Sequence, residues 1–275
     1  MSEGADAVTV AGTGLHSGVT SRVRLFRDDS HDDSHDEDSG GMIRFRRAGC
    51  EVAAGLEHVV ATPRCTVLGA DGVRVALVEH LLAALQIAGW WRGLVIELDA
   101  DEVPILDGSA APWLAALAEL GTPPAPPEPL TAQTSWGYRD GGSRVGLEPG
   151  PARLCAEIDF AHPSVGQQRW CGSPDRYADL AGARTFGFLA EVEQLRQQGL
   201  IAGAGLENAI VFDEVGPLAP LRCPDEPVRH KALDFLGDSF LFGRPIAGRI
   251  SVVRGSHRLH IEALRRLRAD YASVM

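Results

Sequence analysis

Two side chains four residues apart, His230 and Asp234, are the first candidates for chemistry in this sequence. They lie in the stretch VRHKALDFLGD (228–238), whose Ala, Leu and Phe residues supply a buried face for a helix. Pro227 precedes it, where a helix loses nothing by lacking an N–H. Positions i and i+4 share one helix face, so the imidazole and carboxylate are spaced to bind one metal ion. An isolated match of this kind is more often a solvated polar face, so other residues must support the metal hypothesis.

Glu79 and His80 form a second candidate pair, at the start of a helix expected from Val78 to about Gly89. Neighbouring side chains on a helix diverge by about 100°, so both can face one cavity and address different atoms. In zinc hydrolases a His binds the metal, the metal lowers the pKa of its water to about 7, and a carboxylate accepts the proton. Taken alone, Glu79 is equally well explained as a favourable charge at the positive end of the helix dipole.

Together, His80, His230 and Asp234 would form a metal site of the catalytic type. Two nitrogens and one oxygen leave a fourth position for water, whereas structural sites more often have four ligands, usually including Cys. This ligand set suits both Zn²⁺ and Fe²⁺.

A general acid is a further requirement, and His257 is the candidate for it. It follows Gly255 and Ser256 on an expected mobile or tightly turned loop. A protonated imidazole there could donate to a leaving amine. Asp238, one helical turn past Asp234, could orient that imidazole and raise its pKa. His260 is equally eligible by spacing alone.

Composition limits the class of protein. The 275 residues are 45% hydrophobic and 23% charged, which indicates a globular chain of one large or two medium domains. A net charge of −11 argues against nucleic acid as a partner. No apolar run reaches the ~18 residues that span a bilayer, and the acidic start lacks the features of a signal peptide. We therefore expect a cytoplasmic monomer with no membrane span.

The cysteines bear on the redox state of the chain. All are scattered without a C-x-x-C pair, at positions 50, 65, 155, 171 and 223. This pattern favours reduced thiols over a disulfide framework or a Cys-based zinc site.

The elements that must position these residues alternate between strands and helices. Strands are expected at 7–10, 21–26, 42–46, 62–68, 73–77, 94–98, 144–147, 153–160, 209–212 and 246–253. Helices are expected at 78–89, 113–120, 190–198, 228–238 and after 257.

A proline-rich segment, 122–129, divides the chain nearly in half and predicts a stiff linker. We therefore expect a first domain at 1–121 and a second at 130–275. The first would carry an acidic loop at 27–41, which lacks apolar residues to bury and should be solvated or disordered. Both halves contain a Val-x-His that begins a helix, which a duplicated domain would explain.

Eight segments, taken in order, resemble the motifs of the UDP-3-O-acyl-N-acetylglucosamine deacetylase family, the zinc amidases of lipid A biosynthesis. They are GTGLHSG (12–18), TPRCTVL (62–68), VEHLLAAL (78–85), EVPILDGSAAPW (102–113), ARTFGF (183–188), NAIVFD (208–213), VRHKALDFLGD (228–238) and RGSH (254–257). They span nearly the whole chain, which is far more specific than any single motif. The acidic insertion at 28–41 departs from the family pattern.

The resemblance implies an α+β fold of two similar domains, with helices sandwiched between two sheets and the active site between the domains. It also implies an inserted element at about 187–207 whose apolar passage receives the acyl chain. The residues that would supply this passage are Phe188, Leu189, Val192, Leu195, Leu200 and Ile201.

For catalysis, the resemblance implies a general base at Glu79 and a proton donor at His257. Asp238 matches the residue that orients His257, and Thr185 matches a hydroxyl that helps the metal hold the oxyanion. The implied zinc ligands are His80, His230 and Asp234.

For substrate binding, Lys231 matches a cation that contacts the substrate and Phe186 an aromatic that packs on it. Cys65 falls near the site without being a ligand. The phosphates of UDP are negatively charged, so cations are expected at the site although the chain as a whole is acidic. Lys231 and Arg229 are candidates, whereas Arg184 is equally explained as structural.

We therefore expect zinc-dependent hydrolysis of the N-acetyl group of UDP-3-O-acyl-N-acetylglucosamine. The chemistry agrees independently, because amide hydrolysis needs a nucleophile, an oxyanion stabiliser and a proton for the amine. The alternatives are a zinc amidase for another acylated amino-sugar and a catalytically silent, metal-stabilised binding protein. Glu79, Thr185 and His257 argue against the silent protein, because metal binding alone needs none of them.

Overall fold

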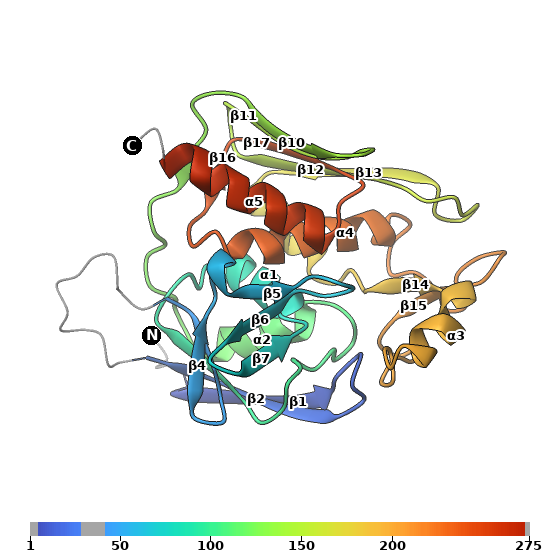
Figure 1. Ribbon diagram of the computed structural model, residues 1–275, viewed down its shortest axis with the longest axis horizontal. Coiled ribbons are helices and arrows are strands. Elements are labelled where there is room, and N and C mark those ends of the chain that lie inside the picture. Colours follow the sequence, from blue (N-terminus) through green and yellow to red (C-terminus); the bar gives the residue numbers. More distant parts are fainter. Residues whose placement is uncertain (1–4, 29–41, 273–275) are drawn as a thin grey trace.

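Two five-stranded sheets enclose a layer of helices in the computed structural model, which describes residues 5–28 and 42–272 (Figure 1). In Figure 1, α4 and α5 lie beneath the upper sheet, and α1 and α2 lie above the lower one. The helices of this layer are α1 (Glu79–Ala88), α2 (Ala111–Glu119), α4 (Glu226–Phe240) and α5 (His257–Ala272). This arrangement confirms the expected α+β fold with helices between two sheets.

The first sheet has the strand order β1-β2-β8-β3-β4. Its strands are β1 (Ala7–Thr13), β2 (Thr20–Arg27), β8 (Leu94–Leu98), β3 (Arg44–Arg47) and β4 (Cys50–Ala53). All pairs are antiparallel except β3 with β8. In β2, Ser21, Val23 and Leu25 alternate inward, as the period-2 pattern predicts. A smaller sheet joins β5 (Val59–Ala61), β6 (Val67–Ala70) and β7 (Val73–Ala76).

The second sheet repeats this topology with the order β10-β11-β17-β12-β13. Its strands are β10 (Trp136–Asp140), β11 (Ser143–Glu148), β17 (Arg249–Val253), β12 (Arg153–Asp159) and β13 (Gln167–Gly172). Again the sheet has one parallel pair, β12 with β17, which joins the third of its strands in chain order to the last. In each half a helix, α1 or α4, precedes that last strand. The faint sequence echo between the halves therefore corresponds to a repeated fold, while the division at 122–129 stays a prediction.

One continuous core joins the two halves through the contact between α1 and α4. Its largest fully buried side chains include Trp90, Trp113 and Phe235. Gly237 makes the close contact possible, because a Cβ there would lie 2.0 Å from the carbonyl oxygen of Glu79. The two helices that carry the candidate ligands are thus held backbone to backbone at this glycine.

A smaller unit projects from one side of the sandwich (Figure 1). It contains β14 (Phe186–Phe188), α3 (Leu189–Gln197) and β15 (Ile210–Phe212), and β14 pairs in parallel with β15. This unit includes the residues of the inserted element expected at about 187–207, and its role in receiving an acyl chain stays a prediction.

Two of the expected strands are wrong in extent. Residues 62–66 bend without forming a strand, and β6 begins only at Val67. The residue Arg64 has a φ of 67° within this bend. Expected strand 246–253 breaks at Gly248, whose φ is 152°, into β16 (Ile246–Ala247) and β17. There β16 leaves the large sheet to pair with β9 (Leu130–Thr131), which directly follows the proline-rich segment.

Two further expectations need correction. His257 does not lie on a loop but is the first residue of α5. The cysteines are not all reduced: Cys155 and Cys171 form a disulfide across the β12–β13 pair, where the register sets them opposite each other. Spacing in the sequence could not reveal this, because the pairing depends on strand register. Residues 29–41, most of the expected acidic loop, lie outside the described residues, and Arg27 belongs to β2.

No helix in the described part of the chain combines the length and apolar character needed to cross a membrane.

Candidate active site

The contact between α1 and α4 brings His80, His230 and Asp234 into one buried cluster. His230 Nε2 lies 3.3 Å from Asp234 Oδ1, and His80 Nε2 lies 3.9 Å from the same oxygen. Two ligands that each lie ~2.0–2.2 Å from a tetrahedral ion are separated from each other by about 3.4 Å. The three side chains are therefore spaced as ligands of one ion, and neither imidazole makes a hydrogen bond to Asp234 Oδ1.

The protonation states of these side chains also fit a metal. Burial lowers the pKa of His80 to about 3, and it lowers the pKa of His230 as well, so both rings are neutral. Burial alone would raise the pKa of Asp234, but its electrostatic interactions with His230 and Lys231 hold it well below its usual range. Neutral imidazole and ionised carboxylate are the forms that bind metals.

The other contacts of His230 and Asp234 leave the atoms that would bind the metal available. The Nδ1 of His230 lies 3.1 Å from the carbonyl oxygen of Ala183 and donates its proton there, which leaves the lone pair on Nε2. Asp234 Oδ1 is buried and has no hydrogen-bond partner among the described residues. A buried carboxylate oxygen without a partner is costly, and a bound cation would satisfy it.

Glu79 lies beside this cluster at the first position of α1. Its Oε2 accepts a hydrogen bond from the backbone N–H of Thr66 at 3.0 Å. Burial, opposed by the charge of His257, raises the pKa of Glu79 to about 7. A carboxylate with this pKa can accept a proton near neutral pH.

His257 faces Glu79 from α5, with 3.6 Å between its Nε2 and Glu79 Oε1. Its Nδ1 donates to Asp238 Oδ2 at 2.8 Å. Burial alone would lower the pKa of His257, but the charges of Asp238 and Glu79 raise it to about 10. The imidazole is therefore protonated at neutral pH and can donate from Nε2.

The structure adds Thr66, whose function the sequence did not reveal. Its hydroxyl donates to Asp238 Oδ1 at 2.6 Å while its backbone N–H binds Glu79. One residue thus contacts both carboxylates that flank His257. Thr66 and Asp238 are 172 positions apart, so no local spacing signals the contact. The only hint was that Thr66 lies within a recognised motif.

Lys231 and Phe186 adjoin the metal cluster, and Thr185 precedes Phe186 in the chain. Lys231 donates to Asp234 Oδ2 at 2.8 Å, and its Nζ lies 5.5 Å from the centre of the Phe186 ring. That ring lies 6.3 Å from the His230 ring. The backbone of Thr185 is bonded to Gly108 and Ile210, whereas its hydroxyl has no hydrogen bond to another described residue.

Two of the candidate cations, Arg184 and Arg229, have structural partners. Arg184 is buried and bonded to Glu226 through Nε at 2.8 Å, so it supports α4. Arg229 is bonded to Asp225 at 2.8 Å. Burial raises the pKa of Cys65 far above its usual range, so the thiol is protonated at neutral pH.

His16 lies near this site on the glycine-rich loop. Its backbone N–H and that of Ser17 donate to the two oxygens of Glu102, each at 2.8 Å. Neither ring nitrogen of His16 has a hydrogen-bond partner among the described residues. Burial lowers its pKa, and His257 is among the charges that act on it.

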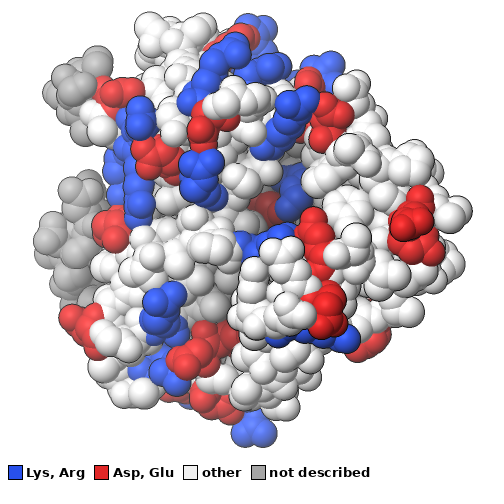
Figure 2. Space-filling model, turned by 45° about the vertical axis from the view of Figure 1, so that its right-hand side comes forward, with Lys and Arg blue, Asp and Glu red and all other residues white. Residues whose placement is uncertain are grey.

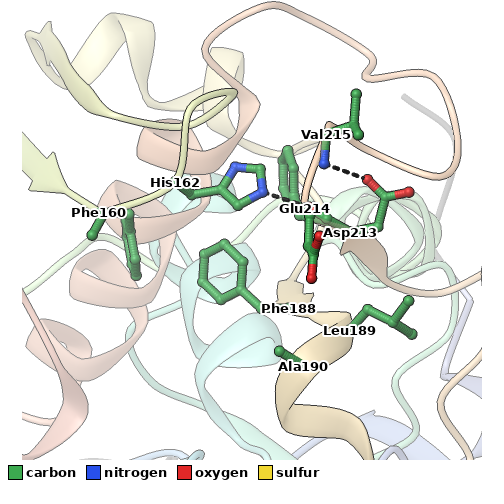
Figure 3. Close-up of a pocket in the computed structure, with 10 residues that line it drawn as sticks. Phe160, His162, Phe188, Leu189, Ala190, Asp213, Glu214 and Val215 are labelled. Carbon is green, nitrogen blue, oxygen red and sulfur yellow. Dashed lines mark hydrogen bonds between the residues drawn. The ribbon is translucent and has the colours of Figure 1, made fainter.

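A cavity of about 600 Å³ lies beside the projecting unit. Figure 3 shows Phe160, His162 and Phe188 together at its wall. Of the six residues expected to form the acyl passage, only Phe188 and Leu189 line it. Phe160, His162 and Phe212 also line this cavity, and they were not expected beside α3 because they come from strand ends whose position the sequence does not give.

The projecting unit keeps much of its apolar surface uncovered. No residue of α3 is buried, and Leu189 is 49% exposed. Leu206, Val215 and Leu218, from neighbouring segments, are also exposed. The exposed apolar side chains of this unit are suited to contact an apolar ligand, whereas Ile210 and Phe212 of β15 belong to the core.

Basic side chains border a hollow on the face shown in Figure 2, although the chain is acidic overall. A pocket of about 460 Å³ is lined by Arg144, Arg169 and Arg254. Arg254 pairs with Asp159 and stands three residues before His257.

Comparison with known proteins agrees with this geometry. The sequence profile of the UDP-3-O-acyl N-acetylglycosamine deacetylase family matches residues 5–269. A relative from Myxococcus xanthus, named UDP-3-O-acyl-N-acetylglucosamine deacetylase, is 41% identical over 274 residues, covering 95% of this chain and 84% of the relative. A relative of the same name from Anaeromyxobacter dehalogenans is 38% identical, covering 98% of this chain and 87% of the relative. One from Thermosynechococcus vestitus is 43% identical, covering 78% and 76%. With similarity of this extent, the chain belongs to the UDP-3-O-acyl N-acetylglycosamine deacetylase family.

Proposed function

We propose that the protein hydrolyses the N-acetyl amide of UDP-3-O-acyl-N-acetylglucosamine, giving UDP-3-O-acyl-glucosamine and acetate, in the biosynthesis of lipid A. Membership of the family supports this reaction. The observation that carries it is the pairing of Glu79 and His257, 3.6 Å apart, beside the candidate metal ligands. A base, an acid and a metal site in one place are what amide hydrolysis requires.

His80, His230 and Asp234 would hold the metal, which we propose to be Zn²⁺, with Fe²⁺ as the alternative that suits the same donors. When bound, such an ion supplies a Lewis acid that polarises the acetyl carbonyl and makes nearby water more acidic.

The chain's own residues move the protons. Glu79 accepts the proton of the water whose oxygen bonds to the acetyl carbon. Thr185, with its free hydroxyl, donates to the carbonyl oxygen as negative charge develops there. His257 gives its Nε2 proton to the amide nitrogen as the carbon–nitrogen bond breaks, so the sugar leaves as a neutral amine. Asp238 keeps His257 oriented and charged until that step.

Substrate binding would use surfaces around this centre. Lys231 and Arg254 would attract the phosphates of UDP, and Phe186 would pack on the sugar. The cavity beside α3 and the uncovered apolar residues around it would receive the acyl chain. Arg229, which pairs with Asp225 as Lys231 pairs with Asp234, stays a further candidate for this role.

Acetate release from the purified substrate tests the proposal. The wild-type protein with Zn²⁺ should release one acetate per UDP-sugar, and mass spectrometry should find the free amine. A chelator should stop the reaction, and added metal should restore it. If the metal-loaded protein leaves the N-acetyl group intact, the proposed function is wrong.

A further inference from the structure

A third histidine, His260, shares the carboxylate of Asp238 with His257. Its Nδ1 lies 2.8 Å from Asp238 Oδ2, the same oxygen that His257 Nδ1 contacts at 2.8 Å. On the other side of the carboxylate, the Thr66 hydroxyl donates to Oδ1. Asp238 is fully buried, so these donors replace the water that would otherwise solvate its charge.

The surroundings of His260 indicate which of its nitrogens carries the proton. Burial lowers the pKa of His260 despite the nearby charge of Asp238, so the ring is neutral and has a single N–H. The charge of His257 holds the pKa of Asp238 below its usual range against the effect of burial, so the carboxylate accepts. The proton of His260 therefore sits on Nδ1. Its Nε2 is buried without a partner among the described residues, where an N–H would be left unsatisfied.

The chain makes room for this ring. His257 and His260 stand in the first turn of α5, three residues apart, so they share a face. A Cβ on Gly255 would lie 2.5 Å from His260 Nε2, so the glycine leaves space for the imidazole. The edge of the ring packs against Phe235 of α4, with the ring centres 5.2 Å apart.

We propose that His260 is a positioning residue for the acid: with Thr66, its Nδ1–H holds the Asp238 carboxylate so that Oδ2 faces His257. This inference rests on the proposed function, in which His257 protonates the leaving amine. His260 is itself 0% exposed, so it acts through Asp238 and not on the substrate.

Two substitutions separate the donor from the volume of the ring. In His260→Asn the amide N–H lies as many bonds from Cα as Nδ1 does, so the donor remains. His260→Leu fills the site without a donor. We expect kcat within about threefold of wild type for the Asn variant and a loss of about 10- to 100-fold for the Leu variant, part of the contribution of one general acid. KM should change less than about twofold in both, because His260 does not touch the substrate.

The control and a second measurement keep the test decisive. His58→Leu, at a half-exposed His outside the site, should retain wild-type kcat and KM. If His260→Leu does not fold, His260→Gln replaces it, because its amide lies one bond further out. Nitrogen-15 NMR of the wild-type histidines without substrate should find His260 protonated on Nδ1.

A proton on Nε2 of His260 would overturn the inference, and so would a Leu variant with wild-type kcat or an Asn variant as slow as Leu. A wild-type protein that releases no acetate would instead count against the proposed function, and NMR would still decide the role of His260.

Discussion

Replacing Asp238 by Asn should lower the pH at which His257 loses the proton that it donates to the leaving amine. Burial alone would lower the pKa of His257, but in the wild-type protein the charges of Asp238 and Glu79 raise it to about 10. Asp238 Oδ2 is 2.8 Å from His257 Nδ1, so its charge acts almost at contact. Asn keeps the size of the side chain and removes the charge. The pKa of His257 should then fall to about the ordinary value of 6.5, because burial continues to lower it and offsets the effect of Glu79.

The size of the effect follows from the protonated fraction. With a pKa of about 10, nearly every molecule has charged His257 at pH 8. With a pKa of about 6.5, only about 3% do, so activity at pH 8 should fall about 30-fold or more. At pH 6 most of this loss should disappear. Activity should fall as the pH rises, because His257 acts as an acid and loses its proton when the pH exceeds its pKa.

The assay is the pH dependence of kcat/KM with metal content measured in each sample. Wild type should follow a bell, rising as Glu79 ionises and falling as His257 loses its proton. A cation bound at the cluster lowers both pKa values by repulsion, so variants are compared with the same metal bound. Asp225→Asn, at the beginning of α4 and paired with Arg229, is the matched control and should keep the wild-type profile. If the alkaline limb of the Asp238→Asn profile stays at the wild-type pH, the reasoning is refuted.

Three further predictions follow from the same site. Glu79→Ala should keep the metal and lose at least about 100-fold in kcat, because general bases contribute roughly 10²–10⁴-fold; wild-type-like turnover would remove the base assignment. His80→Ala should lose the metal, and full occupancy by elemental analysis would exclude His80 as a ligand. Gly237→Ala should destabilise the fold by about 1–3 kcal/mol in denaturant unfolding, because the new Cβ would lie 2.0 Å from the Glu79 carbonyl oxygen; Gly182→Ala, with open space around it, should not.

The sequence by itself determined the local half of the site. The helix period places His230, Asp234 and Asp238 on one stripe, and adjacency places Glu79 next to His80, because these relations need only 3.6 residues per turn. The glycine after α1 and the proline inside the first turn of α4 indicated where these helices end and begin. The recognised motifs then identified the family, since their order is a property of the chain alone.

Only the tertiary structure decided which distant side chains meet. The 3.9 Å between His80 and Asp234 depends on two helices crossing at Gly237, and Thr66 reaches Asp238 across 172 positions. The Cys155–Cys171 disulfide depends on the register of β12 with β13, and His260 became distinct from other eligible histidines only when its nitrogen was placed at Asp238. Hydrogen bonds and packing between residues so far apart in the sequence depend on how whole helices and strands are arranged in the fold. Residue spacing along the chain carries no information on that arrangement.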